Sequence, residues 1–482
     1  MRINTLKLLS KQVWSSKTKN ASTKWLIGVF NAMLFFALTA GYQNLRLQQE
    51  TVEHYRHEVR ERWESRPDKH PHRMAHYGYV AFRQRFPLSF FDFGMDSYLG
   101  NAVFLEAHRQ NTVNFSEASL SNGLLRFGEI SAGMILQLLL PLLLFFWGFD
   151  LVAREREHGT LRIILTQGVS WQELLLGKSL GLFYLALSIV VPSLILGFIL
   201  LVINPLSLQE SQVFLRFLGL IIGYFIYFFV LSVMAVWVSA KAKSSKSALT
   251  QLIGCWLFFT LMLPKLSQVV GQTLFPAPSK IEFDTTVEHE LIQQGDSHNP
   301  NDPHFKAMKD SLLAVYGVDS THKLPFNYSG YVMREGEKLS AETYQKHQAA
   351  LVEIYQKQQD VVRFTAIFNP YMAIKNLSMA LAGTDYAAYD DFQRQTENFR
   401  YSLAQTLNEL QIKLISNKVK SSADKKAVIS QKYWSQLPDF RYHFLTCTAV
   451  LKHEIFSVIS LVLWVVGLSF LIRYFFNQLN DF

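Results

Sequence analysis

Cysteine and charge are the two things this sequence has little of. Only 2 of its 482 residues are cysteine, which excludes a disulfide scaffold, because such scaffolds use several pairs. Cys255 lies in an apolar run and Cys447 lies outside one, so we expect no bond between them. Charged residues make up 18% of the chain, below the about 25% of an average soluble protein. The chain is therefore too apolar for a soluble enzyme or a disordered protein.

Apolar sequence is abundant instead, at 49% of the residues, with 38 phenylalanines. A helix that crosses a bilayer needs about 20 mostly apolar residues. We predict a mainly α, polytopic membrane protein with six transmembrane helices. The first run lacks a small-x-small cleavage site, so we interpret it as a span and not as a signal peptide. The six predicted spans are residues 25–42, 129–153, 174–203, 214–240, 248–270 and 455–472.

The distribution of basic residues predicts the orientation. Residues 1–24 contain several basic residues and no acidic one, and three lysines separate the fourth span from the fifth. Basic residues concentrate on the cytoplasmic side of membrane proteins. We therefore predict a cytoplasmic N-terminus (1–24), a cytoplasmic loop (154–173) and a cytoplasmic C-terminus (473–482). Together with the three lysines between spans four and five, these segments account for the net charge of +9, so the basic balance indicates topology and gives no sign of nucleic-acid binding.

Two large segments then lie on the outer side, at 43–128 and 273–452. Both are predicted to be mostly helical, so that two insertions build one extracytoplasmic domain. Residues 45–64 continue the first span as a helix. A second helix is predicted to begin at Ser340, and a third to cover 385–415 with Thr384 as its N-cap.

The cytoplasmic loop carries the clearest functional signal. It contains Arg154, Glu155, Arg156 and Glu157, then Gly159-Thr160, a short amphipathic stretch and Gly168. We predict that Gly159 allows a tight turn and that Ser170 caps the third spanning helix. Such a segment can pass force from a cytoplasmic partner to two spans. The alternative, an ordinary charged linker on the lipid headgroups, is equally compatible with these residues.

This loop resembles the signature of type-2 ABC transporter permeases, in which acidic residues precede Gly-Thr, a short helix and a Gly-Lys that opens the next span. The six-span plan also resembles the branch of that family with large extracytoplasmic domains after spans one and five. Three outer motifs support the resemblance: Ala75-His-Tyr-Gly78, Leu105-Glu-Ala-His-Arg-Gln110, and Ala382-Gly-Thr-Asp385 with Phe392 and Arg400. The outer domain of that branch has no assigned function.

The resemblance implies a permease subunit that binds no cofactor itself and works with separate cytoplasmic ABC ATPase subunits, which use the ATP. It also implies a second permease chain, as a homodimer or a heterodimer, in the bacterial inner membrane. A protein that docks on the outer domains is a further candidate partner. The residues expected to contact the ATPase and couple it to the spans are Arg154, Glu155, Arg156, Glu157, Gly159, Thr160 and Lys178.

No phosphate-binding loop is recognisable in this chain. Such a loop requires Gly-x-x-x-x-Gly-Lys-Ser/Thr between a strand and a helix. The nearest string, which ends in Gly177-Lys178-Ser179, lacks the first glycine and opens a membrane span. ATP hydrolysis by this chain alone is therefore not expected, and no Ser-His-Asp arrangement suggests another catalytic site.

Histidines are concentrated in the outer segments, and His70, His72 and His76 lie close in sequence. Imidazoles at this spacing can bind zinc or copper, with His54 and His57 as further ligands. No cysteine or carboxylate accompanies them, so we expect no physiological metal site there. Glu106 and His108 are two residues apart and do not share a helix face. A structural network involving Glu106 and Arg109 is the favoured interpretation.

Polar residues inside the spans are candidates for the transport path, because polar groups facing lipid are costly. For each, interhelical packing is about twice as favoured as contact with cargo. Spans two and five line the path in members of the resembled family, which ranks Gln137 and Gln251 first. The four candidates are Asn31, Gln137, Thr250 and Gln251.

The favoured interpretation is the permease subunit of an ATP-driven exporter for an amphiphilic or peptide-like cargo. A first alternative is a mechanotransmission subunit that drives periplasmic work, such as metal delivery or protein maturation, without moving cargo. A second is a membrane receptor or sensor, but the inner segments are too short for a signalling domain. A polar-lined cavity between two permease chains would favour export, and a dry interface would favour force transmission.

Overall fold

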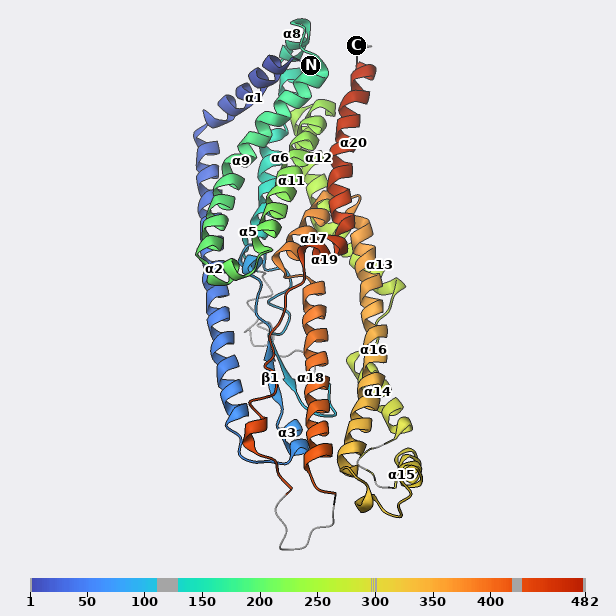
Figure 1. Cartoon of the computed structure of the whole chain (residues 1–482). Coiled ribbons are helices and arrows are strands. Elements are labelled where there is room, and N and C mark those ends of the chain that lie inside the picture. Colours follow the sequence, from blue (N-terminus) through green and yellow to red (C-terminus); the bar gives the residue numbers. More distant parts are fainter. Residues whose placement is uncertain are drawn as a thin grey trace.

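The computed structural model describes residues 2–110, 129–295, 297, 299, 301–417 and 427–479, and the side chains up to Arg473. Within them, a bundle of apolar helices forms one half of an elongated molecule and a mostly helical distal domain forms the other (Figure 1). Six helices are long and apolar enough to cross a membrane. The prediction of a mainly α, six-span protein is therefore confirmed.

The first spanning helix is much longer than the predicted 25–42. Helix α2 runs unbroken over Ala21–Glu64 and continues from the bundle into the distal domain. The expected helical continuation over 45–64 is thus confirmed. Helix α1, Ile3–Thr18, precedes it and lies against α9, Trp171–Ile203, at the end of the bundle where α20 also finishes. We call this end the terminal end.

The second span is composite. It consists of α5 (Ala132–Met134), a π-helical turn η3 (Ile135–Leu139) and α6 (Leu140–Gly148) in direct succession, and Pro141, which has no backbone N–H, lies just after the π-helical turn. The regular helix stops at Gly148, and the short helix α7 (Ala153–Glu157) begins at the residue where the predicted span ends. The remaining bundle helices are α9, α11 (Val213–Lys241), α12 (Ser245–Leu257), the π-helical turn η4 (Phe258–Met262), α13 (Leu263–Leu274) and α20 (Ile455–Leu479).

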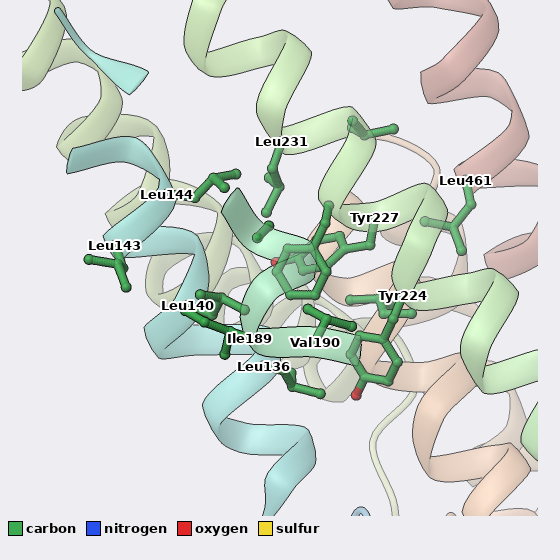
Figure 2. Close-up of a cluster of buried hydrophobic side chains, with 14 of the residues drawn as sticks. Leu136, Leu140, Leu143, Leu144, Ile189, Val190, Tyr224, Tyr227, Leu231 and Leu461 are labelled. Carbon is green, nitrogen blue, oxygen red and sulfur yellow. The ribbon is translucent and has the colours of Figure 1, made fainter. Parts of the chain in front are cut away.

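The core of the bundle is a continuous apolar cluster built from spans two, three, four and six. Leucines of the second span pack against Ile189 and Val190 of α9 and against α11 (Figure 2). Leu461 of α20 closes the cluster on another side. Spans one and five contribute less to it, and most of their apolar surface is exposed within this single chain.

The distal domain contains one two-stranded sheet and a set of helices. Strands β1 (Tyr79–Phe82) and β2 (Ala102–Leu105) pair antiparallel, with Tyr79 opposite Leu105. The other elements are α3 (Pro71–Tyr77), η1 (Pro87–Phe90), α10 (Pro205–Gln209), α14 (Lys280–Gln294), α15 (Pro303–Tyr316), η5 (Thr321–Lys323), α16 (Tyr328–Ala366), α17 (Pro370–Ala382), α18 (Tyr386–Leu414), η6 (Gln431–Tyr433) and α19 (Cys447–His453), of which α10, α17 and α19 lie at the junction with the bundle.

Two helix starts differ from prediction. Helix α16 begins at Tyr328, where the Asn327 side chain caps it, and passes through Ser340 without a break. Helix α18 is capped by Asp385, whereas the hydroxyl of Thr384 binds the backbone of Asp92 at 3.0 Å. Ser340 lies inside α16 and so starts no helix, and Thr384 stands one residue before the true cap, Asp385.

A buried charge cluster joins α16 and α18. Arg400 donates to Glu337 at 2.6 Å and to Glu397 at 2.8 Å, and also to the backbone carbonyl of Glu106. Burial raises the pKa of Glu397. Burial opposes ionisation of Glu337 too, but the hydrogen bond from His108 and the charge of Arg400 hold the pKa of Glu337 below its usual range. The cluster ties the segment that follows β2 to both long helices.

Candidate functional site

The loop between spans two and three folds into two short helices, α7 (Ala153–Glu157) and α8 (Thr160–Thr166), at the terminal end of the bundle (Figure 1). Arg156 donates to the backbone carbonyls of Ala240 and Ala242, where α11 ends. Helix ends leave such carbonyls without internal partners, so an arginine is well suited to bind them. Glu157 accepts hydrogen bonds from the backbone nitrogen and hydroxyl of Ser245, both at 2.8 Å, where α12 begins.

Helix α7 is also fixed to the third span. Lys178 of α9 is buried and lies 3.2 Å from a carboxylate oxygen of Glu155. The hydroxyl of Thr160 binds the same carboxylate. In addition, the hydroxyl oxygen of Ser239 in α11 accepts hydrogen bonds from the backbone nitrogens of Val152 and Ala153, at 3.0 and 3.1 Å. The segment is therefore attached to spans three, four and five at once.

Glycines shape the segment as the sequence predicted. Gly159 has a φ of +77° and Gly168 a φ of +82°, and nothing lies within 4 Å of a Cβ added at either. The backbone angle, and not lack of space, therefore favours glycine at these turns. Ser170 caps α9, and Glu173 completes a reciprocal capping box. The predicted turn at Gly159 and the predicted cap at Ser170 are both confirmed.

The seven residues proposed from sequence for contact with an ATPase fall into two groups, one bonded within the chain and one exposed or half-buried. Glu155, Arg156 and Lys178 are engaged within the chain, as just described. Arg154, Glu157 and Gly159 are exposed, and Thr160 is half-buried. Sequence reasoning missed an apolar residue in the middle of α8, Ile163, which is 56% exposed next to the exposed Arg162. The sequence feature that could have identified Ile163 is its place in the short amphipathic stretch that follows Gly159-Thr160.

Helix α1 forms a second part of this region that the sequence did not reveal. A Cβ added at Gly177 would lie 2.7 Å from Leu9, and one added at Gly181 would lie 2.6 Å from Val13. The four-residue spacing of these glycines is the spacing that lets helices approach closely. Lys17 binds Asp150 at 2.8 Å, just before α7. Helix α1 is thus held both to α9 and to the start of the segment.

The predicted path residue Gln137 occupies a closed, hydrogen-bonded position. Its side-chain nitrogen donates to Asp92 at 2.9 Å and to the hydroxyl of Tyr224 at 2.8 Å. Ser378 of α17 donates to the same Asp92 oxygen at 2.5 Å, and Tyr224 lies 3.1 Å from Ser378. All four side chains are buried. We call Asp92, Gln137, Tyr224 and Ser378 the polar centre.

The polar centre depends on the π-helical turn of span two. A π turn shifts the backbone hydrogen bonds by one residue and leaves carbonyls to be satisfied elsewhere. Tyr227 donates to the carbonyl of Gln137 at 3.1 Å, and Trp256 of α12 donates to the carbonyl of Leu138 at 2.9 Å. Spans two, four and five and α17 therefore meet around the π-helical turn and the polar centre.

The other three predicted path residues lie elsewhere. Asn31 donates to the carbonyls of Ile27 and Ser188, at 2.9 and 3.3 Å, and so links α2 to α9. Thr250 and Gln251 are exposed on α12, where Thr250 donates to the carbonyl of Lys246 and Gln251 to the hydroxyl of Ser247 in the same helix. The structure does not bring the four candidates together. They divide into inward-facing residues (Asn31, Gln137) and outward-facing residues (Thr250, Gln251).

A line of exposed polar and small residues continues along span five from Gln251. Gly254 has nothing within 4 Å of an added Cβ, so this face is open. Its further members, all on α13, are Lys265, Gln268 and Gln272. We call Gln251, Gly254, Lys265, Gln268 and Gln272 the span-five stripe. Polar side chains on a spanning helix are costly when they face lipid.

Two protein-family models match this chain. The model described as ABC-2 membrane transporter related matches residues 105–241, which include spans two to four and α7–α8. The model described as a domain of unknown function, DUF3526, matches residues 280–443, which include α14 to α18 of the distal domain. Together these matches support an ABC-2 type permease family for this chain.

One relative of this permease is the probable ABC transporter permease protein NosY of Pseudomonas aeruginosa. The two are 31% identical over 165 residues, which is 30% of this chain and 58% of the relative. The permease therefore spans a little over half of that relative's length in the match. The family resemblance inferred from the Gly159-Thr160 loop and the outer motifs is confirmed at the level of the family.

The histidines of the permease group differently from the sequence expectation. His54 and His57 are exposed on α2, and His70 precedes α3. His72 and His76 instead lie beside His108, which follows β2. His108 binds Glu337 at 3.0 Å, and Glu106 pairs weakly with Arg109 at 3.8 Å.

Proposed function

We propose that this chain is the permease subunit of an ATP-driven exporter and that α7–α8 receives the force of a separate ATPase. The observation that supports this proposal is that one face of the segment is bonded within the chain and another is exposed. Its inner face is bonded to α9, α11 and α12, whereas Ile163 and Arg162 stand exposed on α8. A push on α8 would reach spans three, four and five together, because Glu155, Arg156 and Glu157 each bind a different one.

The span-five stripe supports a second permease chain and a path between the two. Gln251, Gln268 and Gln272 would face lipid in a single chain, which is unfavourable. A second chain packed on this face would bury the stripe and offer it polar partners. A path between two such stripes, walled by the apolar residues of α12 and α13, suits an amphiphilic or peptide-like cargo.

In this proposal the terminal end faces the bacterial cytoplasm, the distal domain faces the periplasm, and the chain sits in the inner membrane. Basic residues of α1 and of the α11–α12 connection lie at the terminal end, in keeping with the usual cytoplasmic excess of lysine and arginine. The chain itself binds no nucleotide, and the partner ATPase uses the ATP. Purified permease is expected to hydrolyse no ATP unless that ATPase is added; azide-insensitive turnover by the chain alone would contradict this.

The coupling proposal is tested by Arg162→Glu with Ile163→Asp, which removes the apolar contact and reverses a charge on α8. Burial of an isoleucine contributes about 1.5–3 kcal/mol, so co-purification with the co-expressed ABC ATPase should fall about tenfold or more. Folding should survive, since both side chains are exposed. The measurement is ATPase bound per permease, together with ATP turnover of the complex.

The matched control is Leu8→Asp on α1, an equally exposed apolar residue at the same end of the molecule, at 68% exposure. It should leave association unchanged. If the double variant binds and stimulates the ATPase as the wild type does, α8 is not the contact. Charge reversal at Glu155 is a poor test, because it would place a like charge against buried Lys178.

Transmission of force without transport is a second candidate function, favoured by the unbroken helix α2. Spin labels on α2 and on α18 of the distal domain would report distance changes during ATP turnover. Movement of the distal domain in a complex whose span-five stripe is closed by a cross-link would support this alternative. Loss of movement on cross-linking would support export.

A further inference from the structure

Two histidines share one face of the short helix α3. His72 and His76 are four residues apart, so their side chains lie one above the other. Their Nε2 atoms are 3.1 Å apart and their ring centroids 4.6 Å apart. In a tetrahedral site with Zn–N bonds of about 2.0–2.1 Å, two ligand nitrogens are about 3.3 Å apart. This pair is therefore already spaced as two ligands of one ion.

The β1–β2 hairpin brings a third histidine to this face. Because Tyr79 pairs with Leu105, the chain that leaves β2 passes next to the chain that enters β1, directly after α3. The backbone nitrogen of Ala107 donates to the carbonyl of Ala75 at 3.2 Å. The ring of His108 lies 5.4 Å from that of His72 and 5.5 Å from that of His76. One ring nitrogen from each of the three lies within 4.8 Å of the other two.

The third histidine is held in place by a buried carboxylate. Glu337 of α16 accepts both the backbone nitrogen of His108, at 2.9 Å, and its Nδ1, at 3.0 Å. Glu337 is fully buried and also binds Arg400 at 2.6 Å. A carboxylate paired with arginine accepts hydrogen bonds, so the proton of His108 belongs on Nδ1 and the lone pair on Nε2. A carboxylate that orients a histidine in this way is the usual second layer of a metal site.

We propose that His72, His76 and His108 bind a divalent transition-metal ion of the zinc and copper class. Neutral imidazoles are the ligands that Zn²⁺ and Cu²⁺ favour, and a set without thiolates disfavours Cu⁺. Three protein ligands leave a fourth coordination position for water or for an exchanging group. His76 is exposed, so the ion would be reachable from the surface of the distal domain. The site is independent of the coupling proposal.

The sequence expectation of no metal rested on different residues. It considered His70, His72 and His76 with no carboxylate nearby. In the structure, the third histidine beside His72 and His76 is His108 and not His70. A carboxylate is also present, that of Glu337, which is 229 positions from His108. Neither contact leaves a local pattern in the sequence.

The test uses the full-length purified chain without any ATPase, stripped by a chelator and then exposed to Zn²⁺. Stoichiometric zinc should remain after dialysis, and Co²⁺ used as a probe should give the intense absorption of a tetrahedral ion. His72→Ala with His76→Ala should abolish both signals. The matched control, His54→Ala with His57→Ala, removes two exposed histidines of α2 and should retain them.

A second pair of variants separates ligand loss from misfolding. Glu337→Gln should weaken zinc binding about 10–100-fold without abolishing it. His108→Asn should abolish binding, while asparagine tolerates the positive φ of 59° found there. Circular dichroism and gel filtration check that each variant is folded. Absence of stoichiometric zinc in the wild type, or its retention in the His72–His76 double variant, would overturn the proposal. Equal loss in the α2 control would do the same.

Discussion

Gln137 of span two and Gln251 of span five are the same residue type in two apolar spanning helices, but their surroundings differ. Gln137 is 4% exposed and bonds two other elements through Asp92 and Tyr224. Gln251 is exposed and bonds Ser247 of its own helix. An amide that is fully partnered inside one chain serves its packing. An amide left on a spanning surface indicates that something else covers it.

The comparison also shows how the two spans are used. Span two is locked to α11 and α17 by the polar centre, so it can move only with them. Span five is held at its start through Glu157 and Ser245, in its middle by Trp256 and Asn369, and in its second half by packing of α13 on α16, while much of its apolar surface is exposed. We therefore expect substitutions in the polar centre to change stability, and substitutions in the span-five stripe to change association and transport.

The largest expected effect is that of Gln137→Leu. It removes the amide that donates to Asp92 and Tyr224 and leaves their buried polar groups without that partner, at a cost of about 2–3 kcal/mol. The measurement is thermal unfolding in detergent, with Gln251→Leu as the matched control. The control should stay within about 0.5 kcal/mol of the wild type. Equal destabilisation by both variants would show that the two glutamines contribute equally to stability, against this prediction.

A smaller effect is expected from Gln251→Leu combined with Gln268→Leu. Unfolding of the single chain should be unchanged, but association with the second permease chain should weaken by ~1 kcal/mol, about fivefold, because hydrogen bonds between helices in membranes have this size. Energy transfer between labelled chains in nanodiscs measures the association. Unaltered association in this double variant would show that the stripe faces lipid.

The smallest effect is expected from Thr250→Val. The hydroxyl of Thr250 already bonds the carbonyl of Lys246 at 3.1 Å, so its loss should change association by less than about threefold, or ~0.6 kcal/mol. Thr39 of α2 makes the same kind of bond to its own helix, to Phe35 at 2.8 Å, and Thr39→Val is the matched control. An effect of Thr250→Val larger than that of the glutamine pair would place the centre of the interface at Thr250.

Features that depend on local sequence could be predicted. Six apolar runs gave six spans, Gly159 and Gly168 gave two turns, and Ser170 gave a helix cap. Each follows from hydropathy or from the backbone preference of one residue. The continuation of the first span over 45–64 was likewise visible in its helical spacing of apolar residues.

Features that depend on distant contacts could not be predicted. Asp92 lies in an irregular segment with no periodic pattern, and only folding places it against Gln137 and Ser378. The same holds for His108, which the strand register carries to α3. Helix α17 was missed because its apolar residues stand between two long polar helices and resemble a loop. For the seven coupling residues, sequence gave their place in the chain but not the direction of each side chain.

Helix α2 has a mechanical consequence for any motion of the bundle. Its 44 residues extend about 66 Å at the usual rise per residue, without a proline or a break. A rigid rod of that length amplifies rotation: a tilt of about 5° at one end would displace the other by about 6 Å. Asn31 binds this rod to α9 near its inner end, and Arg56 binds it to Asp439 near its outer end, at 3.0 Å. A small rotation of α9 would therefore displace the distal domain by more than the diameter of a water molecule.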